Sequence, residues 1–545
     1  MLKKNQYLQL LFSNNCLESV IDNLKDNKET LFSCLLVNRL LCKHVIPYLW
    51  SSPFDLEINP NKHKLIIRTY ISCLREEEKQ WLINYQELTT PTIDYPKYLK
   101  IFNNNQIQEA VEKFISEEKE EKEEEETEKI GLLYKLITNL LFKNTKGFTD
   151  LEITRNYSTI TDIKFTNLIQ ALTKLHTFEF SGVCSQKICQ LFKNFAQNIN
   201  TIQKLSILFQ PQNGQEIAFE IILSITELIK SQTEITSLTI SQYLDNCNYS
   251  EIYSSINFHS NSLKFLRIEG LVQVQQLLNV LKNCNNLETL QLWEIDGIDN
   301  DNLFNSNYPG FEIKNIKNLY CDGYYSNHST LTTIRFFLRI CNQNLKMLWL
   351  SHVTKEILKD IGDYFPNLNY LSLKIYEEEL PYLIKLLPSM ILENFTLSII
   401  PNSNNNELLL FNNHNIAINF TTSLIMQLTN SMPITLRYFG IDFIMKKRDF
   451  KFFFESLRVP LIQLAILESS IIYDYVLMDI LTYAKKYGTL KELIYDQSYD
   501  DKNFSEKMLE EARTVIPKIR VLKRGKSSIC KNYFDIQYYD ESRRN

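Results

Sequence analysis

The chain has 545 residues, 44% of them hydrophobic, so it is long enough to bury a large core or several domains. Its formal net charge of −5 offers no basic excess for a phosphate backbone, which argues against nucleic-acid binding. No apolar run approaches the roughly 18 residues of a membrane span and the 11 cysteines show no paired spacing, so we expect no membrane partner, reduced thiols, and a cytoplasmic or nuclear location.

The first predicted element is a helical module over residues 10–52. An amphipathic helix beginning near Asn15 carries its apolar positions on one face, at Leu17, Val20, Ile21 and Leu24. A polar turn at 25–29 leads into a second helix, which Pro47 ends or kinks. Its apolar positions are Leu31, Cys34, Leu35 and Leu41. So short a segment cannot bury this much apolar surface alone, so we expect a partner surface to cover the remainder.

This segment resembles an F-box. The residues that carry the resemblance are Cys16, Leu17, Val20, Ile21, Leu24, the run SCLLVNR at 33–39, Cys42 and the pair Leu49 and Trp50. The resemblance implies docking on a Skp-type adaptor protein and, through it, on a cullin. The residues it implies for adaptor binding are Leu17, Val20, Ile21, Leu24, Leu31, Cys34, Leu35 and Val37.

The segment departs from the family pattern in two places: Phe12 and Ser13 stand where the family has Leu-Pro, and Leu41 replaces the Trp that usually precedes the position of Cys42. An alternative interpretation of the module is a helical cap that seals the first unit of a repeat array, because such arrays need capped ends.

Residues 53–146 form a predicted helical and linker region. The segment 64–85 has a helical pattern, and 88–102, with Pro91 and Pro96, is typical of an extended connection. Residues 116–129 are an acidic low-complexity run, which we expect to loop out as a solvated segment. The alternative for this run is an acidic docking segment for a basic partner.

A repeated motif fills residues 147–525. It consists of an apolar residue, two of any kind, an apolar residue, any residue and an apolar residue. Its fourteen copies begin at Phe148, Leu175, Ile202, Ile235, Leu263, Leu287, Ile316, Leu345, Leu368, Leu392, Leu436, Leu461, Leu490 and Ile516. Their separations run from 23 to 33 residues, apart from one of 44, and most lie near the length of a leucine-rich repeat.

Each copy predicts a short strand, because its last two apolar residues alternate and so point to the same side. Helical patterns lie between copies, with apolar residues at Ile217, Ile221, Ile225 and Leu228 in one and at Val274, Leu277, Leu278 and Leu281 in another. The predicted fold is therefore an α/β solenoid, curved, with parallel strands on the concave face and helices outside. It resembles the helix-backed repeats of F-box/leucine-rich-repeat proteins. In this chain we expect a C-terminal tail at 526–545 after the repeats.

Aromatic residues recur at the outward positions of adjacent predicted strands. Aromatic and Arg side chains anchor many protein interfaces, so we predict that this stripe binds a target protein. The predicted contact residues are Phe265, Arg267, Gln291, Trp293, Tyr320, Met347, Trp349 and Tyr370. The alternative is that some of these rings pack on one another or under loops.

Motifs of catalysis or cofactor binding are not found. The seven histidines match no metal-binding spacing, Cys184 and Cys189 have no second pair nearby, and no glycine-rich phosphate loop is present. We therefore expect a non-enzymatic protein without metal or cofactor. The resemblance to F-box/leucine-rich-repeat proteins implies a substrate-recruiting subunit of a ubiquitin ligase. One alternative is a repeat scaffold or inhibitor with no link to a ligase. Another is an enzyme within 53–146, where His63 is the only histidine.

Overall fold

The structure is a computed structural model of the 545-residue chain. It describes residues 14–25, 27–54, 61–80, 88–116, 123–154, 165–183, 185–209, 215–242, 248–270, 274–295, 312–323, 328–341, 344–400, 421–443, 445–467, 473–497 and 504–523. The predicted tail at 526–545 and part of the acidic run lie outside these residues. The chain forms two compact units, residues 1–265 and 266–545.

The first unit begins with helices and continues as strand–helix repeats. Its strands are β1 (Ile101–Asn103), β2 (Asp150–Thr154), β3 (Thr177–Gly182), β4 (Lys204–Phe209) and β5 (Ser237–Gln242). Its helices are α2 (Asn14–Leu24), α3 (Lys28–Leu35), α4 (Arg39–Leu49), α5 (Asn61–Ser72), α6 (Glu76–Lys79), η2 (Tyr95–Tyr98), α7 (Asn104–Ser116), α8 (Glu123–Asn144), α10 (Phe165–Ala171), α11 (Gln186–Asn198), α12 (Gln215–Ser231), α13 (Ser250–Ile256) and η3 (Asn257–His259). Strands β1 to β5 pair in parallel in chain order.

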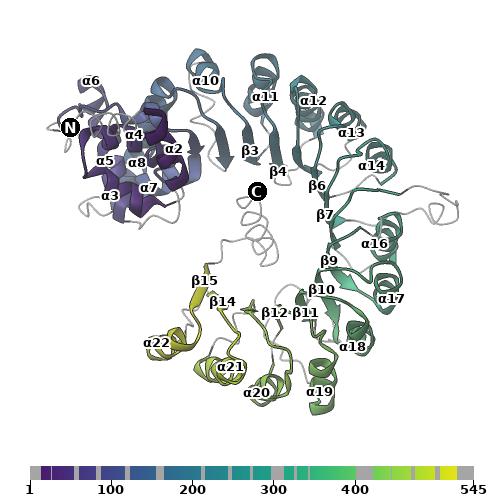
Figure 1. Ribbon diagram of the computed structural model, residues 1–545. Helices are drawn as coiled ribbons and strands as arrows, with labels where there is room; N and C mark the ends of the chain where they lie inside the picture. The colour runs from purple at the N-terminus through teal and green to yellow at the C-terminus, as the bar shows by residue number, and fades with distance from the viewer. Residues whose placement is uncertain are drawn as a thin grey trace, which may run out of the picture. The chain divides into compact units, whose positions relative to one another are not determined.

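The second unit repeats the same alternation. Its strands are β6 (Phe265–Gly270), β7 (Thr289–Ile295), β8 (Asn318–Gly323), β9 (Met347–Val353), β10 (Tyr370–Tyr376), β11 (Asn394–Ile400), β12 (Tyr438–Asp442), β13 (Gln463–Ile466), β14 (Glu492–Gln497) and β15 (Lys518–Lys523). Its helices are α14 (Val274–Leu281), α16 (His328–Ile340), α17 (Lys355–Tyr364), η4 (Glu377–Glu379), α18 (Leu380–Leu386), η5 (Leu387–Ser389), α19 (Thr422–Ser431), α20 (Lys447–Ser456), α21 (Asp474–Tyr487) and α22 (Glu506–Val515). The strands again follow chain order, and helices α16 to α19 lie along one side of β8 to β11 (Figure 1).

The predicted α/β repeat fold is confirmed. Each of the fourteen motif copies coincides with a strand, which starts two residues after the first apolar position, as β7 does after Leu287. The alternating positions of that copy, Leu290 and Leu292, are fully buried. The predicted apolar positions of α14 are also buried, whereas Ile217 of α12 is exposed.

Strand β1 was not predicted, and it lies in the region assigned to a linker. It pairs with β2 and is followed by α7 and α8, so the repeats begin near residue 101 rather than 147. The three motif positions at this strand are Leu99, Phe102 and Asn104. The last of them is polar, so the segment does not match a motif defined by three apolar residues. The Asn104 side chain, fully buried, donates to the Thr154 carbonyl at 2.6 Å and accepts from the Thr154 amide at 2.7 Å. A side-chain amide that hydrogen-bonds to the backbone of β2 thus stands where the other repeats have an apolar residue.

The acidic run is partly helical. Residues 123–129 form the first turns of α8.

At the start of successive strands, one backbone carbonyl accepts hydrogen bonds from two amides of the next repeat. The Thr149 carbonyl accepts from the amides of His176 and Thr177, at 2.8 and 3.0 Å. In the second unit the Lys317 carbonyl accepts from Lys346 and Met347, at 2.7 and 3.0 Å. One carbonyl that accepts from two successive amides recurs along each unit and holds neighbouring strands in register.

Buried polar side chains join one repeat to the loop of the preceding one. The Gln232 side chain accepts from the Ile202 amide at 3.0 Å and donates to the Ile199 carbonyl at 2.9 Å. His259 does the same for the next loop, with Nε2 2.8 Å from the Ile229 carbonyl and Nδ1 3.4 Å from the Ile235 amide. Different side chains therefore satisfy equivalent buried backbone groups.

Candidate docking surface

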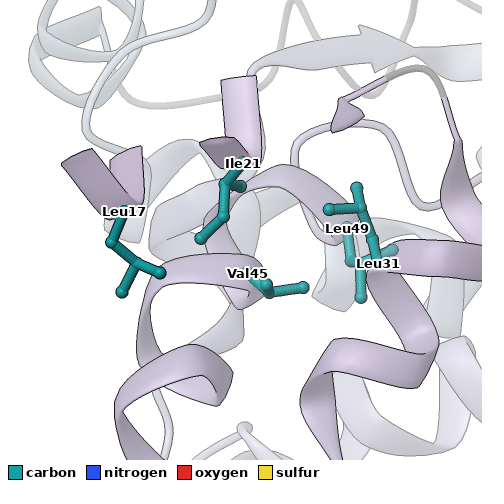
Figure 2. Close-up of a cluster of buried hydrophobic side chains, with 5 residues drawn as sticks. All are labelled: Leu17, Ile21, Leu31, Val45 and Leu49. Carbon is teal, nitrogen blue, oxygen red and sulfur yellow. The ribbon is translucent and has the colours of Figure 1, made fainter. Parts of the chain in front are cut away.

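The N-terminal module has a hydrophobic core of its own. Figure 2 shows the five side chains that form it, Leu17, Ile21, Leu31, Val45 and Leu49, and they come from all three helices α2, α3 and α4. Leu24, Cys34, Leu35, Leu41, Tyr48 and Trp50 pack against this core and are partly buried. The module is therefore a three-helix unit rather than the predicted helix pair.

The second predicted helix divides at Asn38. The Asn38 side chain accepts a hydrogen bond from the Leu41 amide at 2.8 Å and so begins α4, as Asn27 begins α3 by accepting from Thr30 at 3.0 Å. Pro47 does not end α4, which continues to Leu49. The break at 36–38 turns the chain and leaves Leu36 and Val37 between two helices.

Polar contacts fix helix α4 against α2. The Tyr48 hydroxyl donates to the Asp22 carboxylate at 2.7 Å. This hydrogen bond, together with partial burial, raises the pKa of Tyr48 to about 12, so the phenol remains a donor throughout the neutral range.

Large apolar side chains are exposed around the turn between α3 and α4. Leu36 is 90% exposed, Val37 64%, Phe32 43% and Leu40 38%. We call these four residues the α3–α4 patch. Val20 on α2 is also 56% exposed. Clustered exposed apolar residues indicate an interaction surface.

The eight residues implied for adaptor binding fall into three groups. Leu17, Ile21 and Leu31 lie in the module's own core. Leu24, Cys34 and Leu35 are partly buried against it. Only Val20 and Val37 are exposed, and their role in adaptor binding stays a prediction. The sequence analysis missed Phe32, Leu36 and Leu40; the Asn38 cap signal could have revealed the turn that exposes Leu36.

The module is joined to the first repeat through its last residues. The Ser51 carbonyl accepts from the amides of Lys100 and Ile101, both at 3.0 Å, as strand carbonyls do between later repeats. The Trp50 ring packs on Tyr95 with a centroid distance of 4.2 Å and edge-on against Tyr70 at 5.5 Å. The module therefore also caps β1, as the alternative interpretation expected.

Four aromatic residues of the predicted target-binding stripe are buried. Trp293, Tyr320, Trp349 and Tyr370 are between 2% and 5% exposed and form one cluster, with Met347 packed against it. The Trp293 and Trp349 rings lie 5.2 Å apart between centroids. Parallel strands put these rings side by side, since Tyr320 pairs with Trp349. Their burial matches the alternative that the rings pack together, and their role in target binding stays a prediction.

The other members of the predicted stripe differ in burial. Arg267 and Gln291 are buried, whereas Phe265 is half-buried. Arg267 is paired with Glu269, and its guanidinium lies 4.9 Å from the centroid of the Trp293 ring. The Gln291 carbonyl oxygen accepts from the Trp293 indole at 3.1 Å.

A pair of carboxylates occupies the corresponding face of the first unit. Glu152 on β2 and Glu179 on β3 are directly paired in register. Burial and the neighbouring Glu179 charge raise the pKa of Glu152 to about 7, opposed by a hydrogen bond from Asn103. Glu152 therefore titrates near neutral pH.

Comparisons with known proteins find similarity to solved structures. No protein-family model matches the chain, and no curated protein does. The chain is similar in structure to a chain in the crystal structure of the Rad7 and Elc1 complex in yeast, with 15% identity, 94% of this chain and 98% of that chain covered, and a TM-score of 0.38. It is also similar to a chain of the TLR13–ssRNA13 complex, with 15% identity, 69% and 49% covered, and a TM-score of 0.34.

Among the described residues, no helix combines the length and apolar character needed to cross a bilayer. No group of three or more His, Cys, Asp or Glu side chains in these parts of the chain is arranged to hold a metal ion.

Proposed function

We propose that this chain is a substrate-recruiting subunit of a cullin-based ubiquitin ligase. The N-terminal module docks a Skp-type adaptor through the α3–α4 patch, and the repeats hold a protein to be modified. The observation that carries the proposal is the exposure of Leu36 and Val37 in a module whose core is already complete without them. Apolar side chains that the module's own core does not use are available to a partner.

Energetics favour covering this patch. Removing apolar surface from water contributes about 25 cal/mol per Å², so burying a few such side chains against a partner contributes several kcal/mol before the costs of association. The module's own core and the Asn27 and Asn38 caps hold the patch in one conformation, which lowers the ordering cost of binding.

In this role the chain performs no covalent chemistry. A bound target is held near a ubiquitin-charged enzyme, so its modification proceeds at a high effective concentration. Attachment of the module to the first repeat through Ser51 and Trp50 limits the positions that the module can adopt relative to that repeat.

The test is binding of the full-length chain to a purified Skp-type adaptor. The double variant Leu36→Asp with Val37→Asp should lose at least about tenfold in affinity, because charges would replace apolar contacts. The matched control is Ile434→Asp, which alters an 83% exposed apolar residue of the second unit and should bind as wild type. Absence of wild-type binding, or equal binding by the double variant, would refute the proposal.

A repeat scaffold or inhibitor without a ligase link is the second candidate, and the Ser51 contacts favour it because a module that caps β1 has a structural role already. Deleting residues 1–52 cannot separate the two candidates, since it removes Ser51 and Trp50 as well as the patch. The Leu36→Asp and Val37→Asp variant separates them: a scaffold keeps all its partners in this variant.

A further inference from the structure

Helix α5 continues the surface that the α3–α4 patch begins. The Lys62 ammonium at the start of α5 lies 5.3 Å from the centroid of the Phe32 ring, so the side chains of α3 and α5 meet at this point. Leu65 follows one helical turn later and is 64% exposed. Exposed apolar side chains therefore occur on α5 as well as in the α3–α4 patch that Lys62 contacts.

The helices that form this surface carry an excess of positive charge. Residues 28–50 contain Lys28, Arg39 and Lys43 against one carboxylate, Glu29, and residues 61–75 contain Lys62, Lys64, Arg68 and Arg75 with no Asp or Glu. Arg39, Lys43, Lys62 and Arg68 are exposed. This local excess stands out because the whole chain has a net charge of −5.

Resting on the proposed function, we propose that the adaptor-docking surface extends from the α3–α4 patch onto α5, and that the partner presents acidic side chains around an apolar centre. The apolar residues Leu36, Val37 and Leu65 meet the partner's apolar surface. Lys62 and Arg68 of α5, with Arg39 beside the patch, face its carboxylates.

The chemistry assigns separate effects to the two kinds of residue. Rim charges mainly accelerate association and select a complementary partner, and salt screens them. Apolar residues at the centre mainly slow dissociation. A partner protein with an acidic rim and an apolar centre would contact both kinds of residue. A basic and apolar surface also binds anionic membranes, which is the alternative that the experiment must separate.

The experiment measures association of the full-length chain with a purified Skp-type adaptor, in about 50 mM and about 300 mM NaCl. The variant Lys62→Glu with Arg68→Glu should associate roughly tenfold more slowly at low salt, with a smaller difference at high salt. The control Lys346→Glu with Lys359→Glu makes the same change in net charge at exposed lysines of the second unit and should behave as wild type. Leu65→Ser should instead raise the dissociation rate.

The outcomes separate the two proposals. Equal association by wild type and the Lys62 and Arg68 variant, with binding still lost in the Leu36 and Val37 variant, overturns the extension onto α5 alone. Failure of wild type to bind the adaptor removes the proposed function and the extension with it. Sedimentation of wild type with phosphatidylserine vesicles, abolished in the Lys62 and Arg68 variant, overturns the extension by assigning these charges to a membrane.

Discussion

The amide of Ile101 donates a hydrogen bond of 3.0 Å to the carbonyl of Ser51. Ser51 follows the last helix of the N-terminal module, whereas Ile101 is the first residue of the first strand. The bond has the form found between successive repeats, so the helical module takes the place of a preceding repeat. One segment can thereby both seal β1 and present a docking surface.

Replacing Trp50 should loosen this joint. Trp50→Ala removes the ring contacts with Tyr95 and Tyr70 and should lower local stability by about 2–4 kcal/mol. Hydrogen exchange should accelerate at the Lys100 and Ile101 amides. Trp50→Phe, which keeps an aromatic ring, serves as the control, and the Met347 amide of the second unit should be unaffected. Unchanged exchange at Lys100 and Ile101 would mean that Trp50 does not hold the joint.

The buried aromatic cluster should act on stability. Trp349→Ala leaves a cavity beside Trp293 and should reduce the free energy of unfolding by about 3–5 kcal/mol, measured by denaturant titration. Ile434→Ala, at a residue that is 83% exposed, should cost less than about 0.5 kcal/mol. A variant with wild-type stability that no longer captures its target would instead return this stripe to a binding role.

Acidification should weaken the first unit through His259. Burial lowers the pKa of His259 below its ordinary 6.5, although the Ile229 carbonyl opposes this shift. The neutral ring is therefore favoured in the folded state, and its contribution is present above pH 6.5 and lost as the pH falls below that value. Protonation would also turn the Nδ1 acceptor into a donor facing the Ile235 amide.

The measurement is the free energy of unfolding between about pH 7 and pH 5, for wild type and for His259→Gln. Gln232 makes the equivalent pair of hydrogen bonds with an amide side chain, so Gln is the matched replacement. The variant should lose less stability on acidification. Parallel profiles for the two proteins would exclude His259 as a source of the pH dependence.

Glu152 should have the opposite dependence. Its pKa is raised from 4.5 to about 7, so the folded state retains a proton that the unfolded state releases. This contribution is complete below pH 4.5 and is lost as the pH rises through 7. Between about pH 5 and pH 8, Glu152→Gln should lose less stability than wild type, by on the order of 1–3 kcal/mol. Identical losses would show that the carboxylate is as well solvated in the fold as in the unfolded chain.

The sequence could predict the strands because each must point two alternating apolar residues into a shared core. This requirement is local and repeats at similar intervals, so Leu290 and Leu292 could be assigned to the core without coordinates. Strand β1 departs from the rule at Asn104, whose role depends on the backbone of Thr154, 50 residues further along the chain. Because Thr154 is so distant in the sequence, no local pattern could predict its contact with Asn104.

What tertiary structure alone decided is which outward residues remain exposed. Alternation places Trp293 and Trp349 on the face opposite the core, but only the approach of neighbouring rings and segments determines that they are buried. In the module, helical spacing placed Leu17, Val20 and Ile21 on one face, but packing of three helices buries Leu17 and Ile21 and leaves Val20 exposed. Periodicity states the direction of a side chain, whereas solvent exposure depends on what the rest of the chain places beside it.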